Sequence, residues 1–246
     1  MTLASSKDYL VRLAGLAEEI TAAQRLRFEV FNLELGEGLA ASRLSGLDCD
    51  AYDTQCDHLI VEEIASGRIV GTYRLQTGRT AGAGIGYYSA QEFDLSPFEP
   101  FRDRILELGR ACIHRDHRRR AVLELLWKGI AAYAKDRRCE YLLGCSSLTS
   151  QAPAEGWAVY RLLEPHHLAS PEFRTSPLPH CRMEESDLIP AEAKVPRLFA
   201  AYLRIGAKIA GPPAIDRDFG TIDFLTLLDL NRIASHGRRH YLDEPV

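Results

Sequence analysis

Glu107-Leu-Gly-Arg-Ala-Cys-Ile-His-Arg-Asp-His-Arg-Arg-Arg120 is the stretch of sequence that decides the fold. It begins in an apolar run that predicts a strand over 105–113, passes through a basic turn and enters a helix predicted over 121–136. The apolar residues of this helix recur at the i, i+3, i+4, i+7 spacing that places them on one face: Val122, Leu125, Leu126, Gly129, Ile130 and Tyr133. The segment therefore predicts a strand, a basic turn and an amphipathic helix in succession.

The turn carries an unusual concentration of positive charge. Between 110 and 120 there are five arginines and two histidines against one acid, Asp116. A helix N-terminus already presents unpaired N–H groups and a partial positive charge, so additional cations oppose the helix dipole unless an anion completes the site. We interpret the turn as a phosphate site, with a solvated basic turn neutralised by neighbouring acids as the alternative.

The remaining pattern predicts an α/β protein. Strands are expected over 9–13, 58–64, 68–76, 141–145 and 221–230, and helices over 17–35, 153–163 and 195–209. Ala65-Ser66-Gly67 predicts a hairpin, whereas 36–57, 77–86, 87–104 and 170–179 are expected to be irregular. We expect a single domain over 1–246, with a core at about 9–165, an α-β elaboration at about 166–246, and a mixed sheet covered by helices.

Composition excludes several classes of protein. Of the 246 residues, 46% are hydrophobic and 26% charged, which is ordinary for a globular chain, and no apolar run reaches the ~20 residues of a membrane span. A net charge of −4 does not favour nucleic-acid binding. Six cysteines without a CxxC pair or a signal-peptide pattern predict reduced thiols, a cytoplasmic location and no metal site.

Two charged groups lie within apolar strands. Glu107 is expensive to bury unless it is paired, and Arg74 lies in the similarly apolar run Gly71-Thr-Tyr-Arg-Leu75. One interpretation is a structural ion pair between them. The other is a general base with a pKa raised by burial, beside arginines such as Arg110 that orient an anionic group.

An acidic loop precedes the strand predicted over 58–64. Asp48, Asp50, Asp53 and Asp57 lack the spacing of an EF-hand calcium site. They suggest a loop that captures a cationic amine, or alternatively Asx turns and a helix cap.

Together these segments resemble the bacterial L-ornithine N-alpha-acyltransferases, a branch of the GNAT acyltransferase fold. The matching pieces are Ala23-Gln-Arg-Leu-Arg-Phe-Glu-Val-Phe31, Asp53-Thr-Gln-Cys-Asp-His58, Gly71-Thr-Tyr-Arg74, Tyr88-Ser-Ala-Gln-Glu-Phe-Asp94, Glu107-Leu-Gly-Arg110 and Gly211-Pro-Pro-Ala-Ile-Asp-Arg-Asp-Phe-Gly220. The aspartate loop, Arg74 and Glu107/Arg110 also resemble the acyl-homoserine-lactone synthases. The resemblance implies a GNAT-like, mixed and mostly antiparallel central sheet with helices on both faces.

The resemblance also implies a reaction. A fatty acyl group, 3-hydroxylated in this family, would pass from acyl carrier protein to the alpha-amine of L-ornithine, giving lyso-ornithine lipid in the first step of ornithine-lipid synthesis. The cosubstrate would be the acyl-4'-phosphopantetheine of the carrier, or acyl-CoA, with no permanently bound cofactor. The chain has Arg-Asp-His-Arg-Arg-Arg-Ala over 115–121, where acetyl-CoA enzymes of the fold have a glycine-containing loop. Arginine side chains there suit a single phosphate and an acidic carrier surface.

Residue roles implied by the resemblance follow from these matches. Glu107 would be the general base, Arg74 and Arg110 would position substrate, and Tyr160 would protonate the leaving thiolate. The substrate would contact Asp48, Asp50, Asp53, Arg27, Phe28 and Phe31. The donor would contact Ala111, Cys112, Ile113, Arg115, Arg118, Arg119 and Arg120, and apolar residues from Ile85 to Phe98 would flank the acyl chain.

Other readings remain open at this stage. The acceptor would be another amino acid or amine in one alternative. In a second, the reaction would be lactone synthesis from S-adenosylmethionine. In a third, the protein would be a non-catalytic module that binds an acyl carrier. Transient contact with the inner membrane is compatible with an amphiphilic product.

Overall fold

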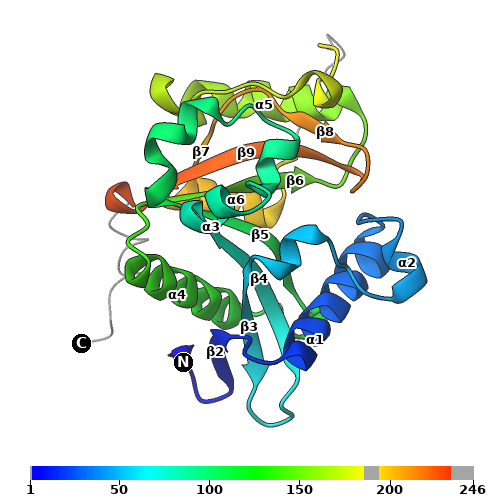
Figure 1. The fold of residues 1–246 in the computed structure, drawn as a ribbon. Coiled ribbons are helices and arrows are strands. Elements are labelled where there is room, and N and C mark those ends of the chain that lie inside the picture. Colours follow the sequence, from blue (N-terminus) through cyan, green and yellow to red (C-terminus); the bar gives the residue numbers. More distant parts are fainter. Residues whose placement is uncertain (1, 186–193, 234–246) are drawn as a thin grey trace.

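A computed structural model describes residues 2–185 and 194–233 of the chain. Within them, one mixed sheet has the strand order β1-β2-β3-β4-β5-β6-β9-β7, with β8 paired to β9 (Figure 1). The strands are β1 (Thr2–Ser5), β2 (Tyr9–Leu13), β3 (Asp57–Glu63), β4 (Ile69–Thr77), β5 (Ile105–Ile113), β6 (Tyr141–Leu148), β7 (Lys208–Ile209), β8 (Ala214–Asp216) and β9 (Thr221–Asp229). Only the β5–β6 pair is parallel among these strands.

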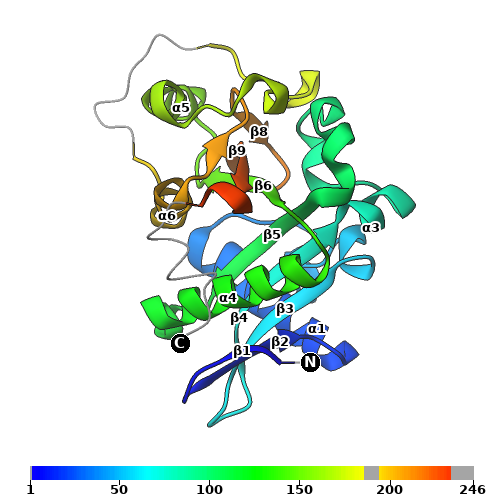
Figure 2. The ribbon, with the colours of Figure 1, turned by 90° about the vertical axis from the view of Figure 1, so that its left-hand side faces the viewer.

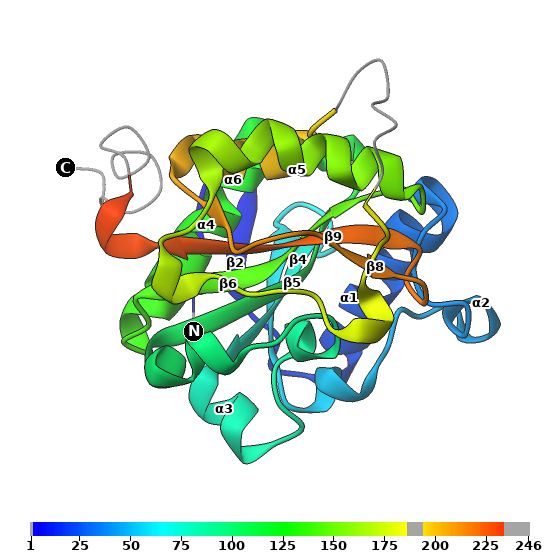
Figure 3. The same ribbon diagram turned by 90° about the horizontal axis from the view of Figure 1, so that it is seen from above.

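Helices cover both faces of this sheet, as expected. They are α1 (Ala17–Phe28), which continues as a π-helical segment over Glu29–Leu35, α2 (Ser42–Ser45), α3 (Gly78–Ala83), α4 (Arg120–Asp136), α5 (Pro153–His167) and α6 (Arg197–Ile205). Figure 1 shows α1 and α4 on opposite sides of β3 and β4. Viewed from above, α5 and α6 lie along one side of β9 (Figure 3). No helix of the described part has the length and apolarity to cross a bilayer.

The helix α4 packs tightly against the sheet, as its apolar face predicts. Val122, Leu126 and Ile130 are fully buried. At Gly129 a Cβ atom would lie 2.7 Å from Val11, closer than real side-chain contacts allow. The glycine therefore permits the close approach of α4 to β2 and β3.

The parallel strands β5 and β6 separate part-way along their length. They pair only from Ile105–Glu107 to Tyr141–Leu143, although both strands continue well beyond these positions. Figure 2 shows the two strands diverging. A cleft lies between the separated parts and is lined by 108–111 and 142–146. Because the adjoining edge of β5 has no pairing with β6 there, its backbone polar groups are available to a ligand.

A bulge lies on β5 at the same level. Residues 110 and 111 stand opposite the single residue Tyr73 of β4, since Thr72 pairs with Cys112 and Arg74 with Gly109. Arg110 has a φ of 50°, which is uncommon for a residue with a side chain. Bulges of this kind re-aim side chains and leave backbone groups unpaired, often beside active sites.

Several local predictions were wrong. The glycine-rich segment 77–86 contains α3, because the Thr77 hydroxyl caps its first turn. The helix predicted over 195–209 ends at Ile205, where Gly206 adopts a φ of 111° and the chain turns into β7. The short strands β1 and β8 were not predicted. The final part of the expected elaboration, from 234 onward, lies outside the described residues.

Candidate active site

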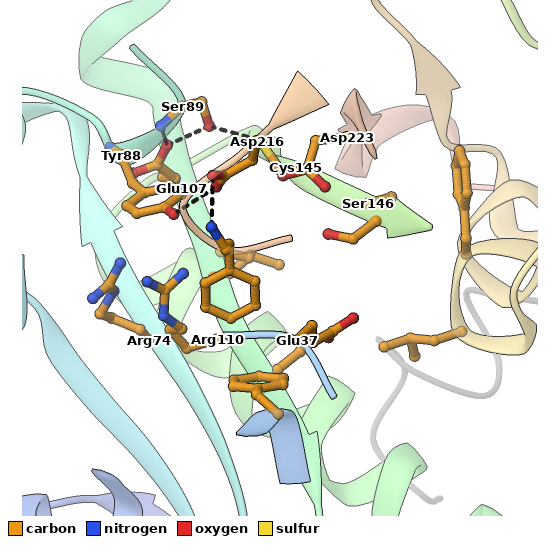
Figure 4. Close-up of a pocket in the computed structure, with 18 of the residues that line it drawn as sticks. Glu37, Arg74, Tyr88, Ser89, Glu107, Arg110, Cys145, Ser146, Asp216 and Asp223 are labelled. Atoms are coloured by element: carbon orange, nitrogen blue, oxygen red, sulfur yellow. Dashed lines mark hydrogen bonds between the residues drawn. The ribbon is translucent and has the colours of Figure 1, made fainter. Parts of the chain in front are cut away.

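A cavity of about 300 Å³ lies where β5 and β6 diverge (Figure 4). Its polar lining includes Glu37, Arg74, Ser89, Glu107, Arg110, Ser146, Asp216 and Asp223. Its apolar lining includes Phe31, Leu35, Leu198, Phe199, Tyr202 and Phe219. Residues far apart in the sequence therefore meet at one place, with an apolar wall beside a charged one.

Glu107 lies at this cavity and is held by a turn that precedes β5 in the sequence. Its Oε1 accepts hydrogen bonds from the Ser89 backbone N–H at 2.8 Å and the Ser89 hydroxyl at 2.6 Å. Its Oε2 accepts one from the Tyr88 N–H at 2.8 Å. Burial raises the pKa of Glu107 above its ordinary value, and these hydrogen bonds act in the opposite direction. A carboxylate has about four lone-pair positions, so Glu107 is fixed in place but retains capacity for a proton.

The alternative ion pair between Glu107 and Arg74 is not formed. Arg74 Nη1 instead lies 2.6 Å from Asp50 Oδ1, and Arg110 Nη2 lies 3.0 Å from Asp50 Oδ2. One carboxylate thus bridges the two arginines of the cavity wall. Arg110 is further held between two rings, with its guanidinium carbon 4.7 Å from the Tyr88 centroid and 4.5 Å from that of Phe219.

A second carboxylate pair continues this network away from the cavity. Arg27, with none of its side chain exposed, lies 2.9 Å from Asp48 and 2.8 Å from Asp53. Asp48 also lies 3.1 Å from Arg110. Asp50 caps the turn Ala51–Thr54 through the Tyr52 N–H, as the Asx-turn alternative expects. These three aspartates already have arginine partners, so their placement does not favour the predicted role as an amine-binding loop.

The other predicted substrate and donor residues divide between the cavity and the core. Phe31 and Ala111 line the cavity, whereas Phe28 is outside its lining. Cys112 is buried in an apolar cluster with Phe31 and Phe219, and Ile113 packs against the main core.

Tyr160, the expected acid, is also outside the cavity lining. Its hydroxyl donates to Glu164 at 3.0 Å within α5. Tyr202 of α6 occupies the cavity instead, and its hydroxyl forms a hydrogen bond with that of Tyr73. Burial raises the pKa of Tyr202 well above its ordinary value, so the phenol stays protonated.

The basic turn follows β5 and does not line the cavity. Arg118 pairs with Glu34, and Arg120 pairs with Glu124 at 2.6 Å. Arg119 occupies the N-cap position of α4, and Arg115 borders a surface depression with His114 and Glu34. The turn thus combines exposed guanidinium groups with a helix N-terminus, and neighbouring acids partly neutralise it.

Three further groups with raised pKa values meet beside the cavity. Glu92, Cys145 and Asp223 each place one donor atom within 4.8 Å of the others. Burial raises the pKa of the Cys145 thiol and of the Glu92 carboxyl well above their ordinary values, and that of Asp223 to about 6. Three acidic groups therefore adjoin the cavity, and the negative charge of Asp223 contributes to raising the pKa values of the other two.

The diverging strands, the β5 bulge and the carboxylate beside them define an acyltransferase of the GNAT class. A family model described as "Acetyltransferase (GNAT) domain" matches residues 26–128. Among solved structures, the AHL synthase LasI aligns over 98% of this chain and all of its own, with 13% identity and a TM-score of 0.56. FeeM, an N-acyl amino acid synthase from uncultured soil microbes, aligns over 96% and 97%, with 10% identity and a TM-score of 0.57. These two likenesses establish the fold.

Sequence comparison identifies the family within this class. The L-ornithine N(alpha)-acyltransferase of Brucella abortus is 37% identical over 94% of this chain and 88% of its own length. The enzyme of the same name from Rhodobacter capsulatus is 34% identical over 97% and 96%. The chain belongs to the L-ornithine N(alpha)-acyltransferase family and is an acyltransferase.

Several residues of the cavity were not predicted from the sequence. Ser89 and Asp216 lie within segments quoted for the family resemblance but received no role. Asp223 carried the same signal as Glu107, a carboxylate inside an apolar strand between Ile222 and Phe224. Glu37 and Tyr202 gave no signal, because only the fold brings them to the cavity.

Proposed function

We propose that the protein transfers a fatty acyl group, 3-hydroxylated in its natural form, from the phosphopantetheine thioester of acyl carrier protein to the α-amine of L-ornithine. The products are lyso-ornithine lipid and the free carrier thiol. The observation that carries this proposal is the fixed, buried carboxylate of Glu107 at the cavity where β5 and β6 diverge. The names of the family's members supply the acceptor.

The donor arm enters the cleft between β5 and β6. Pantetheine contains two amides, which suit the backbone polar groups that the separated edge of β5 offers at 108–111. We infer that N–H groups near Ala111 and Cys112, beside the bulge, hold the developing oxyanion. The basic turn at the end of β5 binds the phosphate and the acidic surface of the carrier.

The reaction begins when Glu107, directly or through a water molecule, takes one proton from the α-ammonium. The amine nitrogen then forms a bond to the thioester carbon, and the carbonyl oxygen takes up the negative charge. Collapse of this intermediate breaks the C–S bond. Tyr202 donates its proton to the thiolate and recovers one from the nitrogen, so that amide and thiol are formed and one proton leaves through Glu107.

The experiment compares Glu107→Gln with Glu140→Gln, which changes a half-exposed glutamate paired with Arg104 outside the cavity. Purified protein, 3-hydroxyacyl carrier and ornithine are incubated, and free thiol and acyl-ornithine are quantified. Loss of a general base should lower turnover by roughly 10²–10⁴-fold while carrier binding is retained. Near-normal turnover in Glu107→Gln would refute the assignment of the base.

The same assay separates the other readings. Transfer to glycine, glutamine or lysine in preference to ornithine would show that the acceptor is a different amino acid. Lactone formation from S-adenosylmethionine would show that the protein catalyses lactone synthesis. Carrier binding without any thiol release would favour a non-catalytic module.

A further inference from the structure

The charges around the cavity are compensated unequally. Arg74 and Arg110 are neutralised from behind by the aspartates of the loop. The cavity carboxylates receive only neutral donors among the described residues. Glu37 accepts from the Thr149 hydroxyl at 2.7 Å, and Asp216 from two backbone N–H groups and the Tyr88 hydroxyl. The cavity therefore retains uncompensated negative charge.

Asp223 has no cationic partner among the described residues. It lies on β9 opposite Ser147 of β6, lines the cavity, and is only 4% exposed. The side chains of Ser147 and Thr221 and the neighbouring Glu92 interact with it, and none of them carries a positive charge. A buried carboxylate without a cation is costly, so the geometry leaves a position for a positive charge that the described part of the protein does not supply.

Of the two adjacent acids Asp223 and Glu92, Asp223 is the one that carries the negative charge. Burial, together with the charges of Asp223 and Asp216, raises the pKa of Glu92 well above its ordinary value. Glu92 is therefore the member of the adjacent pair that holds a proton, and Asp223 carries the charge toward the cavity. The charge of Asp223 in turn contributes to raising the pKa of Glu37, after the larger effect of burial.

Asp223 and Glu107 line the same cavity and are connected through one hydroxyl and one thiol. Glu107 Oε1 is 2.6 Å from the Ser89 hydroxyl, which lies 3.8 Å from the Cys145 sulfur, and that sulfur is within 4.8 Å of an Asp223 oxygen. One hydroxyl and one thiol thus separate the two carboxylates. The two nitrogens of extended ornithine are linked by four carbons and lie about 6 Å apart by standard bond lengths. Figure 4 shows Asp223 and Glu37 around the part of the cavity away from Arg74.

We propose that Asp223, assisted by Glu37, binds the δ-ammonium of the acceptor and thereby selects amino acids with a second, cationic amine. This inference rests on the proposed function and adds the residues that determine acceptor specificity. The ammonium supplies the positive charge that the neighbours of Asp223 lack. The α-amine is then left beside Glu107.

The test measures kcat/KM for L-ornithine and for L-norvaline, which has the same three-carbon side chain without the terminal amine. The wild-type protein should prefer ornithine, and Asp223→Asn should reduce the ornithine-to-norvaline ratio by roughly 10- to 100-fold, the value of a charge-assisted hydrogen bond. Asp229→Asn alters the same strand outside the cavity and should leave the ratio unchanged.

Asp223→Glu provides a second signature. Its carboxylate reaches one methylene further into the cavity, so the preference should move from ornithine toward 2,4-diaminobutanoate, which is one methylene shorter. Glu37→Gln should lower the ornithine-to-norvaline ratio of kcat/KM by a smaller factor. This variant provides the test if Asp223→Asn does not fold.

Two results would overturn the inference while acyl transfer stands. One is equal use of ornithine and norvaline by the wild-type protein. The other is an equal loss with both acceptors in Asp223→Asn, which would give Asp223 a structural or proton-transfer role. Absence of transfer to either acceptor would overturn the proposed function as well.

Discussion

Replacing Asp223 with asparagine should stabilise the fold near neutral pH although it weakens ornithine binding. In the folded state burial, reinforced by the charge of Asp216, raises the pKa of Asp223 from 3.8 to about 6. Above pH 6 the protein therefore bears the cost of an ionised, unpaired carboxylate. Each pKa unit corresponds to about 1.36 kcal/mol, so the cost is at most about 3 kcal/mol. Because Glu92 ionises more readily once Asp223 is neutral, we expect a net gain of roughly 1–3 kcal/mol.

The sign of the effect can be followed with pH. A carboxyl whose pKa is raised by folding binds more protons in the folded than in the unfolded state between about pH 4 and pH 6. The cost of Asp223 is therefore absent below pH 4, grows through that window and is complete above pH 6. The advantage of Asp223→Asn should follow the same course and be about half as large at pH 5 as at pH 8.

The assay is urea and thermal unfolding of the wild-type protein, Asp223→Asn and Asp229→Asn at pH 5 and pH 8. For a chain of this length, 1 kcal/mol moves Tm by about 2–4 °C, so a rise of roughly 2–12 °C is expected for Asp223→Asn at pH 8. Saturating ornithine should stabilise the wild-type protein more than this variant. An advantage of equal size at both pH values, or a destabilised variant at both, would refute the reasoning that Asp223 is an unpaired buried charge.

Three further predictions concern the arginine network, the basic turn and the proton donor. Asp50→Asn removes the bridge between Arg74 and Arg110 but leaves Asp53 3.6 Å from Arg74 and Asp48 3.1 Å from Arg110. Urea unfolding should therefore show a loss of about 1.5–3 kcal/mol, the value of hydrogen bonds to charged groups, and a loss below about 0.5 kcal/mol would show that the bridge is not structural. Changing Arg118 and Arg119 to Gln should weaken carrier binding and flatten its salt dependence, measured by titration at several ionic strengths, because exposed charges are screened over about 8–10 Å. An unchanged salt profile would place the carrier elsewhere. Tyr202→Phe should lower kcat by roughly 10²-fold, and loss of the hydrogen bond to Tyr73 should cost about 1–3 kcal/mol of stability. A normal kcat would leave the thiolate to be protonated by solvent.

Local signals in the sequence were sufficient for the central elements. The segment 105–136 folds as predicted into strand, turn and helix, because its apolar periodicity changes from strand-like to helical at the basic turn. Glu107 was predicted as a functional residue because a carboxylate within an apolar strand is costly to bury. In the structure this carboxylate lies at the cavity. Both inferences depend on residues close together in the chain.

Partners that are distant in the chain could not be predicted in the same way. Arg74 was matched with Glu107 because both lie in apolar strands, but Arg74 and Arg110 both pair with Asp50 of the preceding loop instead. Tyr160 was predicted as the acid from its position after β6. The tyrosine that lines the cavity is instead Tyr202, which lies on α6 shortly before Gly206 ends that helix. Asp223 reaches the site only because β9 pairs with β6, a contact between segments far apart in the sequence.

Buried carboxylates near the cavity differ in the groups that compensate their charge. This difference distinguishes the carboxylates with a structural role from those with a functional one. Asp48, Asp50 and Asp53 are compensated by arginines, so their charges contribute to holding Arg74 and Arg110 in place. Glu107 is compensated by neutral donors from a single turn, which fixes its position but leaves it able to accept a proton. Asp223 interacts with the Ser147 and Thr221 side chains and with Glu92, but with no cation among the described residues. Since a fold gains nothing from a buried charge without a cation, the charge of Asp223 is best explained by a cation that arrives with the substrate.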